Sequence, residues 1–151
     1  LYYYLVFTLG LLFLVLAFIP KSELPKLFWF SMFWGSAYDI LTEGLYHFAN
    51  ITRYAHMGAF HIGALPLWTI LAWTPAIMLF IYFLPRRKEI YTYWLYLLTW
   101  STAVSFVAII LQQVDILIFL KGGPWIWFID SVIFLYLMTL HYRYLERSAA
   151  Q

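Results

Sequence analysis

The chain has 151 residues, of which 65% are apolar, 23% aromatic and 11% charged, and its mean hydropathy is +0.81. A water-soluble domain of this size has about 25% charged and roughly 45–50% apolar residues, so the composition excludes secreted, cytosolic and nucleic-acid-binding classes of protein. The net charge of +2 is too small to mark a polyanion partner, and the lack of cysteine excludes disulfides and thiolate metal sites. The sequence therefore predicts an integral membrane protein with the lipid bilayer as its partner.

Five apolar runs are long enough to cross a hydrocarbon core about 30 Å thick, which takes roughly 20 helical residues. They are residues 1–19, 27–48, 65–84, 90–111 and 124–142. The breaks between them combine proline or glycine with charge, as in Pro85–Glu89 and Lys121–Pro124. The predicted fold is one all-α transmembrane domain over residues 1–151, a bundle of five transmembrane helices.

Two parts of this division stay open. Gln112, Gln113 and Asp115 precede the apolar residues 116–120, so residues 112–120 either extend the fourth helix or form a short interfacial segment. A cleaved signal peptide is an alternative for residues 1–19, although the run has neither a basic start nor a small-residue cleavage pattern.

Lysine and arginine are concentrated on one side of the five predicted spans. That side holds Lys21, Lys26, Arg86, Arg87, Lys88, Arg143 and Arg147. The opposite side holds Arg53 and Lys121. Because basic loops stay in the cytoplasm, we expect the N-terminus outside and the C-terminus inside, in the plasma membrane.

Small residues and one proline predict how the spans pack. Ser31-x3-Gly35 on the second span and Ser101-x3-Ser105 on the fourth allow two helices to approach closely. Pro75 interrupts the third span and is expected to kink it. Thr74 or a neighbouring helix is expected to satisfy the backbone groups that the kink frees.

Three polar residues recur every four positions on the second span, namely Asp39, Glu43 and His47. This spacing places them in one stripe on a helix face, with a drift of roughly 40° per step. A central acidic residue costs about 2.5–3.5 kcal/mol to insert into a membrane, so the stripe is expected to face the bundle interior or a wet cavity. At about 1.5 Å per residue, Asp39 and Glu43 lie roughly 12 Å and 6 Å below the outer boundary.

Other polar groups gather at the same end of the predicted bundle. Asp130, on the last span, lies roughly 9 Å below the outer boundary, and the fourth span ends there as well. The sequence therefore predicts an outward-facing pocket that binds a cation or a small polar or amphipathic ligand, in a binding or transport type of protein. Its predicted ligand-binding residues are Asp39, Glu43, His47, Asp130, Gln112 and Asp115.

The charge of this pocket needs compensation. Three carboxyl groups with few basic neighbours are not expected to be ionised together, because burial and like charge both disfavour ionisation. A shared proton, a bound cation, or Arg53 and Lys121 folded inward would each supply the balance. In particular, we expect Asp39 and Asp130 to meet and to share a proton at neutral pH.

Other interpretations of the same residues stay open. Asp39 and Asp130 can form a protonated pair that only holds helices together. The chain can instead be a non-catalytic accessory subunit that binds another membrane protein or a copy of itself. A less favoured alternative is a metal site of nitrogen and carboxylate ligands, as zinc prefers. Its candidate ligands are Glu43, His47, His56 and His61.

No motif indicates catalysis. Glu43-x3-His47 is not the H-E-x-x-H helix of zinc proteases, and the chain has neither a G-x-S-x-G elbow nor a glycine-rich phosphate loop. Four histidines are too few for a histidine-rich di-iron oxidase, and His141 is better explained as an interfacial residue than as a haem ligand. The sequence predicts no enzymatic activity and identifies no cofactor.

Four short segments, spread over most of the chain from Pro20 onward, carry a resemblance to a known family. They are the Asp-containing Tyr38–Leu41, the run from Pro75 to Pro85 before the basic loop, the turn Gly123–Trp127 and the closing Leu140–Arg143. In these features the chain resembles a family of small multi-span membrane proteins found in spore-forming bacteria. That family has no assigned activity, so the resemblance implies the multi-span architecture and a bacterial inner membrane, and it adds no chemistry.

Overall fold

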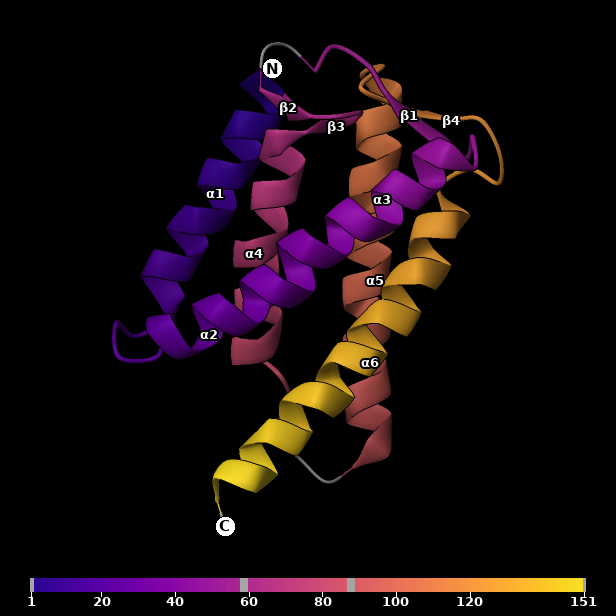
Figure 1. Ribbon diagram of the computed structural model, residues 1–151. Coiled ribbons are helices and arrows are strands. Elements are labelled where there is room, and N and C mark those ends of the chain that lie inside the picture. Colours follow the sequence, from indigo (N-terminus) through magenta and orange to yellow (C-terminus); the bar gives the residue numbers. More distant parts are fainter. Residues whose placement is uncertain (1, 58–59, 87–88, 151) are drawn as a thin grey trace. The chain divides into compact units, whose positions relative to one another are not determined.

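The computed structural model describes residues 2–57, 60–86 and 89–150, and it is mostly helical over them (Figure 1). Within this part of the chain the helices are α1 (Tyr2–Phe18), α2 (Leu24–Ser31), α3 (Tyr38–Phe48), α4 (Leu67–Tyr82), α5 (Ile90–Gln113) and α6 (Trp125–Ala149). A π-helical segment, η1 (Met32–Ala37), joins α2 to α3 without a break. Each of the five predicted runs therefore forms a helix, with α6 continuing past Tyr142. Leu1, Arg87 and Lys88 lie outside the described residues.

Two of the described helices, α5 and α6, are long and apolar enough to cross a membrane. The mean hydropathy of their most apolar stretches is 1.8 and 1.3. The described segments Leu5–Phe18 and Leu67–Tyr82 are also apolar but are shorter. The predicted helical class is confirmed. Of the five predicted membrane crossings, only those of α5 and α6 are supported by helix length and hydropathy in the described part of the chain.

The connections between the helices contain short paired strands, which the sequence did not predict. β1 (Thr52–Tyr54) pairs antiparallel with β4 (Leu117–Phe119), and β2 (His61–Ile62) pairs with β3 (Leu65–Pro66). Their few residues carry too little alternation to stand out from an apolar sequence.

These strands settle residues 112–120. The helix α5 ends at Gln113, and Asp115 then adopts a left-handed conformation (φ 55°), which aspartate tolerates better than most residues. The amide of Ile116 donates to the carbonyl of Leu111 at 2.9 Å, and the chain enters β4. Gln112 and Gln113 therefore extend the helix, whereas residues 114–120 turn away from it.

The chain divides into two compact units. The first consists of Leu1–Phe83 with Leu111–Lys121, and the second of Leu84–Ile110 with Gly122–Gln151. The acidic residues of the second predicted span belong to the first unit.

In the first unit, α4 is the central helix. Contacts reach it from α1, α2 and η1, and its side chains Ile70, Ile77 and Phe80 are buried. Figure 1 shows α1 running beside α4 while the continuous helix of α2, η1 and α3 crosses α4 obliquely. Because α4 is apolar on most of its circumference, it fills the core of this unit.

The crossing of η1 and α4 depends on a glycine. A Cβ at Gly35 would lie 2.8 Å from the carbonyl oxygen of Trp73 and 2.9 Å from its carbonyl carbon. Beside it, the Ser36 hydroxyl donates to the carbonyl of Ile70 at 2.8 Å and lies 2.7 Å from the Thr74 hydroxyl. The predicted close approach at Ser31-x3-Gly35 is therefore confirmed for Gly35. The carbonyl that Pro75 frees is that of Leu71, four residues earlier, and its expected partner stays a prediction.

The π-helical segment keeps one face of this long helix buried. Buried positions recur every four residues, at Leu27, Ser31, Gly35, Asp39 and Glu43. In a regular α-helix such a step drifts by roughly 40°, so the buried face would rotate away from its partner. A π turn closes from i to i+5 and winds less per residue, which reverses part of the drift.

In the second unit, aromatic contacts join α5 to α6. Trp94 and Tyr136 stack with ring centroids 5.5 Å apart and an interplanar angle of 14°. The guanidinium of Arg143 lies 4.8 Å from the ring centroid of Tyr93, which is a cation–π distance. On the predicted small-residue pair of α5, Ser101 is buried and its carbonyl accepts a hydrogen bond from Ser105 at 3.1 Å.

Two glycines of the same continuous helix provide a matched test of the crossing. Gly35→Ala should destabilise the protein by about 1–3 kcal/mol, because the new methyl group meets backbone that cannot move aside. Gly44→Ala should be neutral or stabilising by up to about 1 kcal/mol, since nothing lies within 4 Å of its added Cβ. Thermal unfolding in a mild detergent measures both, and equal effects would contradict the close approach.

Candidate functional site

Two carboxyl side chains are buried on one face of α3. Asp39 is in its first turn and Glu43 in the next, and their exposed fractions are 5% and 4%. They stand four residues apart, so they are neighbours on the helix surface. The predicted inward orientation of these two acidic residues is confirmed within the first unit.

The chain after α3 folds back over Glu43. Asn50 adopts a left-handed conformation (φ 52°), which reverses the chain after the helix and directs it into β1. The side chain of Thr52 is buried, and its hydroxyl donates to Oε2 of Glu43 at 3.1 Å. Glu43 is thus covered by a strand and held by a specific donor.

The pairing of β1 with β4 fixes Thr52 in this position. The amide of Leu120 donates to the carbonyl of Ile51 at 2.8 Å, and the amide of Ala55 donates to the carbonyl of Ile116 at 2.8 Å. Sequence reasoning missed Thr52, because its role depends on a strand partner far along the chain. The one available signal is the alternation of buried Thr52 and Tyr54 with exposed Arg53, which is typical of a half-buried strand.

The other predicted ligand-binding residues are less buried than this pair. His47 is exposed although it continues the four-residue spacing, and Gln112 and Asp115 are exposed at the end of α5 and in the turn after it. These three side chains are thus not buried with the acidic pair, and their part in an outward-facing pocket stays a prediction. Asp130 is half-buried on α6 in the second unit, and its pairing with Asp39 stays a prediction.

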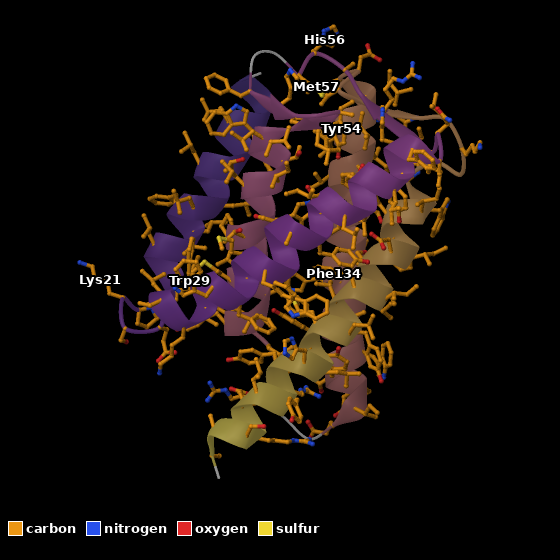
Figure 2. The ribbon with its side chains drawn as sticks, viewed as in Figure 1. Lys21, Trp29, Tyr54, His56, Met57 and Phe134 are labelled. Carbon is orange, nitrogen blue, oxygen red and sulfur yellow. The ribbon has the colours of Figure 1, made fainter. Side chains whose placement is uncertain are left out.

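The metal alternative is not formed in the described part of the chain. Among residues 2–57, 60–86 and 89–150, no three histidine, aspartate or glutamate side chains are grouped as metal ligands. His56 is exposed at the loop end of the first unit, beyond Tyr54 in Figure 2. His61 is also exposed, and its Nδ1 lies 2.9 Å from the carbonyl oxygen of Gly63.

The two basic residues expected to fold inward do not do so. Arg53 points away from the core on the exposed position of β1. Lys121 is also exposed, and its Nζ donates to the carbonyl of Ala49 at 3.4 Å. Of the three predicted ways to balance the buried carboxyl groups, this one is wrong for Arg53 and Lys121, and the proton and the bound cation stay predictions.

Comparisons of the chain with models of protein families, with curated proteins and with solved structures found no match. The resemblance to a family of small membrane proteins from spore-forming bacteria therefore stays a prediction, and the geometry of the site alone indicates what it can bind.

The contact between Thr52 and Glu43 can be tested directly. Thr52→Val keeps the shape of the side chain but removes the donor, so it should cost about 1.5–3 kcal/mol if Glu43 is ionised. In a Glu43→Gln background the same change should cost less, because the acceptor no longer carries charge. Thermal unfolding in a mild detergent of the unaltered protein, the two single variants and the double variant measures the coupling energy between Thr52 and Glu43.

Thr99→Val is the matched control for that experiment. Thr99 is exposed, and its hydroxyl bonds only the carbonyl of Leu95 on its own helix at 2.8 Å among the contacts of the described chain. A loss of stability for Thr99→Val as large as that for Thr52→Val would contradict a specific role for Thr52.

Proposed function

We propose that this chain is a small multi-span membrane protein whose buried carboxyl pair, Asp39 and Glu43, binds a proton or a small cation from the outer side. In this proposal five helices cross the bilayer, with the N-terminus outside and the C-terminus inside a bacterial inner membrane. The proposed activity is binding or transport and involves no catalysis.

The observation that carries the proposal is the burial of two neighbouring acids on one helix face. Asp39 and Glu43 are 5% and 4% exposed, while Arg53 and Lys121 are exposed to the outside. Two carboxylates one turn apart repel each other, and burial penalises the charge of each. Ionisable groups inside a membrane protein are functional sites by default, and a proton or cation shared by these two relieves the repulsion between them.

The ends of the first unit support the proposed orientation. In Figures 1 and 2 the start of α1, the strands and His56 lie at one end, and Lys21 lies at the other, in the turn after α1. Lys21 belongs to the basic group that we place in the cytoplasm. The carboxyl of Glu43, beside β1, is then close to the outer surface.

Reporter fusions test this topology. A cytoplasm-only reporter should be active when it is fused after residue 88 and inactive when it is fused after residue 50 or residue 121, because those loops are proposed to be outside. Activity after residue 50 or 121 together with none after residue 88 would contradict the orientation.

The second candidate, an accessory subunit, rests on the exposed surface of α5. In its most apolar stretch, 17% of the residues are buried inside the molecule. Lipid covers such a surface in the leading proposal, and another membrane protein or a second copy covers it in the alternative. The oligomeric state in mild detergent with added lipid separates the two, since an obligate complex favours the accessory subunit.

Labelling with a hydrophobic carbodiimide tests proton binding, because this reagent modifies protonated carboxyl groups in apolar surroundings. We expect labelling of the intact protein at low pH that falls as the pH rises from about 5 to 9. Asp39→Asn and Glu43→Gln should each lower it at least twofold. Glu146→Gln, which changes an exposed residue near the end of α6, is the control. Labelling that needs neither Asp39 nor Glu43 would contradict the proposal.

A further inference from the structure

Buried hydroxyl groups continue from the carboxyl pair into the first unit. Below Asp39 on the same helix face come Ser36 and Ser31, and Thr74 of α4 lies beside Ser36. Their exposed fractions are 9%, 0% and 7%. We call these residues, together with Asp39 and Glu43, the polar file.

The length of the polar file is comparable with a large part of a membrane's thickness. Ser31 and Glu43 are twelve positions apart, which corresponds to about 18 Å along a helix. This is more than half of the roughly 30 Å hydrocarbon core. Its members follow one another at about one helical turn, so a single water molecule can span each step. Leu27 is buried one turn below Ser31 and closes this end.

The contact between Ser36 and Thr74 can carry a proton in either direction. Their oxygens are 2.7 Å apart and either can be the donor, while the carbonyl of Ile70 accepts from Ser36 at 2.8 Å. When Ser36 donates to Ile70, Thr74 donates to Ser36, and rotation of both hydroxyl groups reverses the order. A hydrogen-bonded chain that moves protons needs this reversibility.

Ser31 gives an independent indication that the file holds water. Its side chain is fully buried, and Oγ has no hydrogen-bond partner among the described residues. Ser105 and Thr139 bond the carbonyl four residues earlier on their helices, whereas Ser31 does not. A buried hydroxyl group without a protein partner is usually satisfied by an internal water molecule.

We propose that the polar file is a hydrated path that leads protons from Glu43 and Asp39 inward to Ser31. This inference rests on the proposed function and deepens it by naming the proton as the ion. A metal cation needs several oxygens around one point, whereas these groups are spread in single file along one helix face. Such an arrangement suits a relay of water and hydroxyl groups.

The test uses single cysteines, because the chain has none of its own. Ser31→Cys, Ser36→Cys and the control Leu27→Cys are placed in phosphatidylcholine vesicles with a small cationic methanethiosulfonate. The thiolate attacks the sulfenyl sulfur of the reagent, forming a mixed disulfide and releasing methanesulfinate. Since thiolate forms where water has access, both serine positions should react at least tenfold faster than Leu27→Cys.

Two further measurements make the result decisive. Carbodiimide labelling of the unaltered protein at fixed pH should not change when sodium or potassium is raised, since the ion is a proton. Mass spectrometry of Ser31→Cys and Ser36→Cys after denaturation should show full modification, which proves that the thiols are intact. If they react as slowly as Leu27→Cys in the folded protein, the hydrated path is overturned.

The same data separate the two proposals. Labelling that depends on Asp39 and Glu43, with unreactive cysteines at Ser31 and Ser36, overturns the path and leaves the binding site in place. Reactive cysteines without carboxyl labelling overturn proton binding by the pair. A fall in labelling when sodium or potassium is added overturns the assignment of the proton and favours a metal cation.

Discussion

The contact of η1 with α4 is the constraint on which the first unit depends. Only a residue without a side chain allows the backbone at Gly35 to reach the carbonyl of Trp73. At this distance the Ser36 hydroxyl reaches both Ile70 and Thr74, so polar groups on two helices satisfy one another within an apolar core. A larger residue at this position would separate the helices and break these bonds together.

The π-helical segment explains which ionisable side chains of the continuous helix are buried in the first unit. Over the four steps from Leu27 to Glu43, a regular α-helix would rotate the buried face by roughly 160°. The wider turn of η1 removes much of that rotation, and Asp39 and Glu43 stay on the buried face. Beyond η1 the chain is α-helical again and the drift resumes, so His47, one step further, is exposed. The equal spacing of these three residues concealed this difference.

Structural features that depend on a local sequence pattern could be predicted. Features that depend on contacts between distant parts of the chain could not. Apolar runs between Pro, Gly and charged breaks predicted the helices, and Ser31-x3-Gly35 predicted a close helix crossing. The pairing of β1 with β4 joins residues that are far apart in sequence, and left-handed turns at Asn50 and Asp115 set it up. Thr52 could not be recognised as a partner of Glu43 without this pairing. The inward fold of Arg53 was predicted from charge alone, whereas the strand alternation places it outside.

If the carboxyl pair binds an ion as proposed, the cover over Glu43 links this binding to the strands. Thr52 reaches Oε2 of Glu43 only while β1 stays in register with β4. A cation that takes this oxygen has to compete with the Thr52 hydroxyl, and a proton placed on it turns the acceptor into a donor. Either event weakens the hydrogen bond between Thr52 and Glu43. Binding of an ion by the carboxyl pair and packing of β1 over Glu43 therefore oppose each other. Because such coupling is reciprocal, a change that loosens the β1–β4 pairing also raises the affinity of the pair for its ion.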